Sequence, residues 1–132
     1  MSIPVTGFAT AFCGLLMVLL SVRISLLRMR LKVALGDGDH PELRRAIRAH
    51  GNTAEHAPIF LLMSACYELY VGASWHLIGL VAVFLLGRLM LVGGLYRAVI
   101  SSARRNGALL TYLPQLLLAL LLMAQVVGSL LA

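Results

Sequence analysis

The sequence predicts an all-α membrane protein, a bundle of four transmembrane helices that forms a single domain over residues 1–132. The chain is 61% hydrophobic, and its apolar residues gather in four runs, at 3–22, 57–71, 75–95 and 108–131. These runs lack the alternation of strands, and open sheet edges are not viable in lipid, so helices are expected. Ten of the 11 Lys and Arg residues lie in or beside two of the gaps between the runs, and the other, Arg88, lies within the third run.

The placement of the cations predicts an orientation. Because translocation of Lys and Arg is resisted, the segments 23–48 and 97–107 are expected in the cytoplasm and both termini outside. Arg23 follows the first apolar run and no basic residue precedes it, which argues against a cleaved signal peptide. The net charge of +6 is interpreted as topology and attraction to anionic membrane lipids, and nucleic-acid binding is not expected.

The first helix is expected to end before the Gly36-Asp37-Gly38 turn. The second is expected to begin near Pro41, which suits a first helical position, because 57–71 alone falls short of the roughly 20 residues that cross a bilayer. We expect this helix to reach about Tyr70 and to kink at Pro58.

Gly72-Ala73-Ser74 predicts a tight turn outside the membrane. The third helix is expected to reach about Val99, and residues 101–106 are expected to form a second inner loop before the fourth helix. Glu68 is interpreted as a polar group at a helix end near the outer surface. Glycines in the third helix favour close approach of helices: Gly79, Gly87, Gly93 and Gly94.

The second helix carries a polar stripe. Arg45, Arg48, Asn52 and Glu55 are spaced 3, 4 and 3 residues apart, which places them on one helix face. Ionisable groups within a transmembrane helix face the bundle interior or a wet cavity, so these residues are functional candidates. No metal site is expected, because the four histidines do not form a ligand set.

Arg88 lies well inside the third apolar run. At 1.5 Å per residue, Arg88 and Glu55 both lie roughly 20 Å from the outer turn, on helices that this turn makes neighbours. We therefore expect Glu55 and Arg88 to pair. The pair, with Asn52, serves either a binding site or the interhelical scaffold alone.

The segment from Arg45 to Glu55, followed by Pro58, resembles the signature of the MAPEG family, the membrane-associated proteins in eicosanoid and glutathione metabolism. The signature reads R-A-[HQ]-x-N-x-x-E, with a proline three residues on. The likeness extends over nearly the whole chain, including Gly87-Arg88 in the third helix and the two basic inner loops. It implies a homotrimer of four-helix subunits that binds glutathione between subunits, near the cytosolic side.

The resemblance also implies site residues. The motif positions that contact glutathione correspond to Arg48, His50, Asn52 and Glu55, and either Arg28 or Arg30 resembles an arginine presented by a neighbouring subunit. Several arginines and one acid suit a peptide with two carboxylates and one ammonium. His56 falls where some members have a ligand-contacting tyrosine.

Active members of the family carry an arginine, near the inner end of the third helix, that stabilises the glutathione thiolate. Arg104 and Arg105 lie in this region, and the resemblance does not decide between them. Where well-studied members have aromatic or histidine groups on the third helix, this chain has Leu91 and Leu95, with Tyr96 as a neighbouring candidate contact.

The function predicted from the resemblance is a glutathione-dependent transferase or peroxidase that acts on lipophilic electrophiles in a bacterial inner membrane. Tyr112 and Gln115 are candidates to line a lipophilic cavity. A first alternative is a non-catalytic member that binds a lipid or a partner protein, which the leucines of the third helix favour. A second is a small multidrug transporter, which the absence of an acidic residue in 3–22 disfavours.

Overall fold

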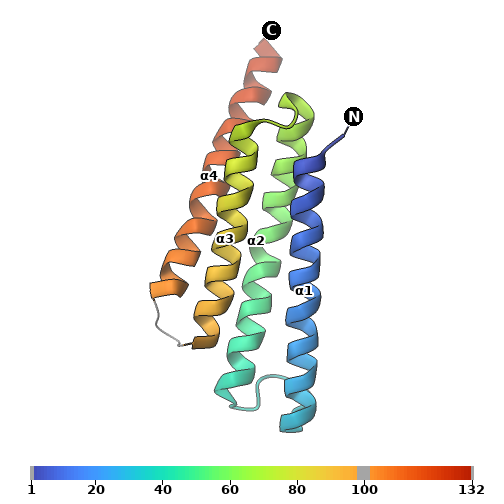
Figure 1. The fold of residues 1–132 in the computed structure, drawn as a ribbon, viewed down its shortest axis with the longest axis vertical. Coiled ribbons are helices and arrows are strands. Elements are labelled where there is room, and N and C mark those ends of the chain that lie inside the picture. Colours follow the sequence, from blue (N-terminus) through green and yellow to red (C-terminus); the bar gives the residue numbers. More distant parts are fainter. Residues whose placement is uncertain (1, 98–101, 132) are drawn as a thin grey trace.

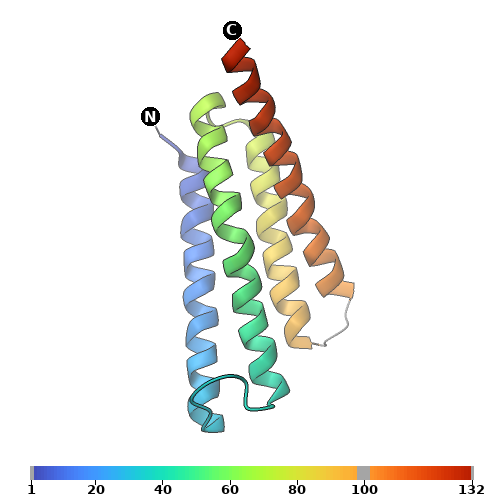
Figure 2. The same cartoon turned by 180° about the vertical axis from the view of Figure 1, so that it is seen from behind.

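The computed structural model describes residues 2–97 and 102–131, which form a bundle of helices running alternately up and down (Figure 1). The helices are α1, Pro4–Leu31; α2, Pro41–Val71; α3, Trp75–Arg97; and α4, Ser102–Leu131. Both ends of the chain lie at one end of the bundle, here the terminal end, and the α1–α2 connection lies at the other, here the loop end (Figures 1 and 2). Helices α2 and α4 therefore run in the same direction.

Within the described residues, α1, α3 and α4 are long and apolar enough to cross a membrane, and α2 is not. The prediction of an all-α membrane protein is confirmed, and the prediction of four spans is supported for three helices. The polar stripe in the first half of α2 lowers the apolarity of that helix below the level of a span. Helix α2 packs against α1, α3 and α4, and Asn52 is the member of this stripe that the bundle buries.

The helix ends follow the local chemistry of the sequence. Pro4 and Pro41 stand at the first positions of α1 and α2, where a missing N–H is tolerated. Helix α1 closes on Lys32 in a left-handed conformation, with φ of 56°. Gly72, with φ of 80°, turns the chain between α2 and α3, and this is a conformation that favours glycine.

Glu68 ties α2 to the start of α1. Its carboxylate accepts hydrogen bonds from the backbone N–H groups of Val5, at 3.0 Å, and Thr6, at 2.8 Å. The residue lies in the last turn of α2, as predicted for a polar group at a helix end, but it is only 2% exposed. The charge is stable there because the first N–H groups of a helix lack intrahelical partners and carry partial positive charge.

Two of the predicted small-residue contacts bring α3 and α4 together. A Cβ on Gly87 would lie 2.8 Å from the carbonyl of Leu110, and one on Gly94 would lie 2.5 Å from the Arg104 nitrogen. Side chains on these two glycines are therefore excluded by the backbone of α4. Gly79 and Gly93 meet nothing within 4 Å and do not contribute to this contact.

The prediction of a loop at 101–106 is wrong for residues 102–106, which form the first turns of α4. No proline or glycine interrupts the segment before Gly107, so its polar residues continue into the helix. Arg104 and Arg105 are therefore helical residues and not loop residues. The predicted end of the third helix near Val99 lies outside the described residues.

Ion pairs close the loop end. Arg30 of α1 pairs with Glu42 of α2, and Arg44 pairs with Asp37 and Asp39 of the connection between these helices. The hydrogen bond from Arg44 holds the pKa of the Asp37 carboxyl below its usual value. These contacts are exposed, so they fix the local path of the chain more than they stabilise the bundle.

Candidate functional site

Helices α2 and α4 present two matching stripes of side chains. On α2 the stripe is Arg48, Asn52, His56, Ile59 and Met63, and on α4 it is Arg104, Ala108, Tyr112, Gln115 and Ala119. Both follow the spacing 4, 4, 3 and 4, which keeps each stripe on one helix face. Because α2 and α4 run in the same direction, both stripes change from cationic to apolar toward the terminal end.

The half of this face nearer the loop end holds a small cavity, here called the arginine pocket. Its volume is about 110 Å³, and it is lined by Arg48, Asn52, Leu91, Leu95, Arg104, Ala108 and Tyr112. Glu55 is adjacent and accepts a hydrogen bond of 3.0 Å from Arg48. Two guanidinium groups and an amide in a confined space suit an anionic ligand.

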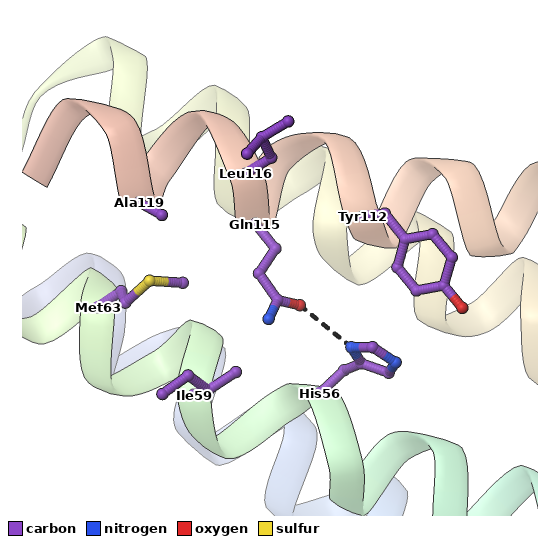
Figure 3. A pocket seen from close by; sticks show the side chains of 7 residues that line it. All are labelled: His56, Ile59, Met63, Tyr112, Gln115, Leu116 and Ala119. Atoms are coloured by element: carbon purple, nitrogen blue, oxygen red, sulfur yellow. Dashed lines mark hydrogen bonds between the residues drawn. The ribbon is translucent and has the colours of Figure 1, made fainter.

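The half nearer the terminal end holds a larger cavity of about 350 Å³, here called the apolar cavity. It is lined by His56, Ile59, Met63, Tyr112, Gln115, Leu116 and Ala119 (Figure 3). His56 Nδ1 and Gln115 Oε1 are 3.2 Å apart, and the His56 and Tyr112 ring centroids are 5.2 Å apart. Polar groups therefore gather at one end of a cavity whose remaining walls are hydrocarbon.

Tyr112 lines both cavities. It stands at the point where the cationic half of the face meets the apolar half, and its side chain is about half exposed. In Figure 3 the hydroxyl lies on the side of the ring away from Met63 and Ala119. A polar and an apolar ligand would therefore meet beside this residue.

Beneath the arginine pocket, Arg88 of α3 is fully buried and binds both α2 and α4. Its Nη1 donates to the Asn52 side-chain oxygen at 2.8 Å and to the Asn52 carbonyl at 3.3 Å. Its Nε donates to the Thr111 hydroxyl at 3.1 Å, and Nη2 donates to the same oxygen. Thr111 in turn donates to the Gly107 carbonyl at 2.8 Å.

The predicted Glu55–Arg88 pair is therefore wrong. Arg88 takes its partners from Asn52 and Thr111, and Glu55 pairs with Arg48 at the surface, where both side chains are about half exposed. This arrangement avoids burying a carboxylate, which costs several kcal/mol of desolvation on an order-of-magnitude scale. Depth along the helices brought Arg88 close to this part of α2, but it did not determine which polar side chain of α2 faces Arg88.

Of the predicted site residues, Arg48, Asn52 and Arg104 come together in the arginine pocket, with Glu55 beside it. The others lie elsewhere in the subunit. His50 is half-buried and lines neither cavity, and Arg105 is exposed. Arg28 donates to the Ala34 carbonyl at 3.2 Å, and Arg30 pairs with Glu42.

Tyr96 lines neither cavity, although it packs against the buried cluster that includes Leu91 and Leu95. The Arg23 guanidinium stacks over its ring at 4.1 Å from the centroid, and its buried hydroxyl has no hydrogen-bond partner among the described residues. Among those residues there is also no group of three or more His, Cys, Asp or Glu side chains able to hold a metal ion.

Sequence reasoning missed Thr111 as a partner of Arg88 and gave Tyr112 no role between two cavities. The signal that marks Tyr112 is the shared 4, 4, 3 and 4 spacing on α2 and α4. This signal can be interpreted only when α2 and α4 are known to be parallel neighbours.

Comparison with known proteins supports the architecture. The model of the MAPEG family matches residues 6–124. The chain is 35% identical over 118 residues to the inner membrane protein YecN from two strains of Escherichia coli, with 88% of each chain covered. With the apolar helices, this confirms the predicted integral membrane protein of a bacterial inner membrane. The chain belongs to the MAPEG family.

Proposed function

We propose that this protein is a glutathione-dependent transferase or peroxidase that acts on lipophilic electrophiles drawn from the bilayer. The observation that carries the proposal is the meeting of two cavities of opposite character at Tyr112. The arginine pocket offers hydrogen-bond donors to an anionic peptide. The apolar cavity offers a hydrocarbon wall to a membrane-soluble substrate.

The chemistry of the arginine pocket fits glutathione in its reactive form. Arg48 and the Asn52 amide are suited to grip a carboxylate, and Glu55, at the pocket's edge, is suited to the ammonium group. Arg104 is suited to stabilise the thiolate, because an adjacent cation lowers the pKa of a thiol from its ordinary value of about 8.5. A thiolate held there attacks an electrophile seated beside Tyr112.

The size of the arginine pocket favours a site completed by a second subunit. Its volume of about 110 Å³ lies well below the roughly 300–1,000 Å³ of ordinary ligand pockets. A tripeptide must therefore extend beyond it. We propose a homotrimer, in which Arg28 or Arg30 of a neighbouring subunit reaches the part of the peptide that one chain leaves uncovered.

We further propose that the loop end faces the cytoplasm, because it carries most of the chain's cations. Glutathione would then enter from the cytosol. Alkaline phosphatase fused after Ala132 is expected to be active, since this enzyme matures outside the cytoplasm, and a fusion within 36–39 is expected to be inactive. The opposite result would overturn the orientation.

Calorimetric titration of the detergent-solubilised protein with glutathione tests the binding step. Saturable binding is expected for the wild type, with a loss of about tenfold or more in affinity for Arg48→Ala. Arg44→Ala is the matched control, because Arg44 lies one turn earlier on α2 and pairs with the connection to α1. Absence of binding by the wild type, or an equal loss in both variants, would contradict the proposal.

A second candidate function is a non-catalytic MAPEG-fold protein that binds a lipid or a partner protein. It is favoured by Leu91 and Leu95, which give the arginine pocket an apolar wall without a hydroxyl or imidazole. Glutathione bound at saturation without any thiolate signal would favour this function over the transferase.

A further inference from the structure

We infer that the Tyr112 hydroxyl is a catalytic hydrogen-bond donor to the electrophile, and that the preferred substrates are those whose reaction places negative charge on oxygen. Conjugated enals and enones and epoxides belong to this class. The inference rests on the proposed transferase function and names its substrate class.

The Tyr112 side chain lies where the two cavities meet. Tyr112 is the residue that the arginine pocket and the apolar cavity share, so atoms reacting across the two cavities meet beside it. No hydrogen bond joins its hydroxyl to another residue in the described part of the chain. The hydroxyl therefore remains available to a ligand.

Neighbouring side chains support the Tyr112 ring. His56 packs against Tyr112 at a tilt of 49° between the ring planes, and the contact of His56 with Gln115 holds the imidazole in place. In Figure 3 the Gln115 side chain reaches across the cavity to His56, while the Tyr112 hydroxyl points away from that contact. The His56–Gln115 contact thus fixes the ring without occupying its hydroxyl.

The arginine side chains and the other polar side chains line different cavities. The cationic donors Arg48 and Arg104 line the arginine pocket, where the nucleophile is proposed to bind. In the apolar cavity the polar side chains are those of Tyr112, Gln115 and His56, of which Tyr112 also lines the arginine pocket. A hydroxyl placed where an oxyanion develops stabilises the new charge through a hydrogen bond.

The proposed reaction with an enal is a conjugate addition. The thiolate sulfur forms a bond to the β-carbon, the C=C electron pair shifts toward the carbonyl, and the carbonyl electron pair moves onto oxygen. The Tyr112 O–H donates a hydrogen bond to this oxygen. Water donates a proton to the α-carbon, and the carbonyl re-forms. The hydroxide that remains combines with the proton that the glutathione thiol released. No oxidant or reductant is needed.

The test compares two lipophilic electrophiles of equal carbon number with the full chain in detergent and glutathione. In trans-hexenal the charge develops on oxygen, whereas hexyl iodide expels iodide and develops none there. Tyr112→Phe is expected to lower kcat/KM for hexenal on the order of a hundredfold. The same variant is expected to keep kcat/KM for hexyl iodide within about twofold of the wild-type value and to leave the thiolate absorbance unchanged. Tyr70→Phe, the same deletion at an exposed position, is the control.

Two results would overturn the role of Tyr112 while leaving the transferase intact. One is an unchanged rate with both substrates in Tyr112→Phe. The other is an equal loss with both substrates together with a weaker thiolate signal, which would assign the hydroxyl to the nucleophile. Wild-type protein that conjugates neither substrate would overturn the proposed function and this inference together.

Discussion

Arg88 donates a hydrogen bond of 2.8 Å to the side-chain oxygen of Asn52, at the point where α2, α3 and α4 meet. This contact fixes the orientation of the Asn52 amide. With its oxygen occupied, Asn52 has two N–H donors left to offer to the arginine pocket. A fully buried cation thus sets the polarity of a site that it does not line.

The Arg88–Asn52 contact predicts energetic coupling between the two residues. Arg88→Leu is expected to cost about 1–3 kcal/mol of unfolding free energy, because it leaves buried acceptors without a donor. Asn52→Leu is expected to cost about as much or more, since it removes a partner from a buried charge. A double-mutant cycle measured by denaturant unfolding should give a coupling of roughly 0.5–3 kcal/mol.

The control is a second double-mutant cycle, which combines Arg88→Leu with Glu55→Gln. Because Glu55 pairs with Arg48 and not with Arg88, the two changes should add within about 0.5 kcal/mol. Coupling between Arg88 and Glu55, together with additivity between Arg88 and Asn52, would refute the contact.

Asn52→Asp is expected to separate folding from binding. A carboxylate at this position keeps an acceptor for Arg88, so the melting temperature should be retained or raised. The same change removes both N–H donors and places a negative charge beside the arginine pocket. Affinity for glutathione should therefore fall by about tenfold or more. Thermal unfolding checks the melting temperature, and calorimetry on the same preparation checks the affinity for glutathione. Unchanged affinity would count against a donor role for Asn52.

Gly87→Ala is expected to destabilise the bundle by about 1–3 kcal/mol, because the new methyl would lie 2.8 Å from the Leu110 carbonyl of α4. Gly79→Ala is the control on the same helix, where a methyl meets nothing within 4 Å, and it should change stability by less than about 0.5 kcal/mol. Equal effects in the two variants would show that α3 and α4 do not approach at Gly87.

Glu68→Gln is expected to loosen the start of α1, because an amide oxygen replaces a carboxylate that accepts the N–H groups of Val5 and Thr6. The cost should be about 1 kcal/mol. Hydrogen exchange should accelerate at those two amides and leave the loop end unchanged. Glu55→Gln, which alters an exposed carboxylate, should leave exchange at the start of α1 as it is in the wild type.

Much of the fold was predictable because the decisive signals are local. Pro41 and the Gly72 turn mark the ends of α2 through backbone chemistry, and the apolar runs mark the helices through their composition. The start of α4 was not predictable in this way. Residues 102–106 are polar, and polar residues at a membrane boundary suit a loop and a helix equally well.

Individual residues of the site were predictable from the sequence, but the contacts between them were not. The motif identified Arg48 and Asn52, and the resemblance brought Arg104 into consideration. Which residues face one another depends on how each helix is rotated about its axis, and depth along the helix does not reveal this. Arg88 therefore bonds Asn52 instead of Glu55, and Tyr112 emerges between two cavities only when α2 and α4 lie side by side.

The proposed transferase function is tested most directly by the ultraviolet absorbance of glutathione thiolate in the presence of the protein at pH 8. Arg104 lines the arginine pocket and Arg105 beside it is exposed, so the two arginines form a matched pair of variants. We predict a saturable thiolate signal in the wild type and in Arg105→Ala. In Arg104→Ala we predict loss of the signal while much of the binding remains, because the residue that stabilises the thiolate and the residues that bind the carboxylate contact different parts of the peptide. Wild-type protein saturated with glutathione and showing no thiolate would refute the transferase function.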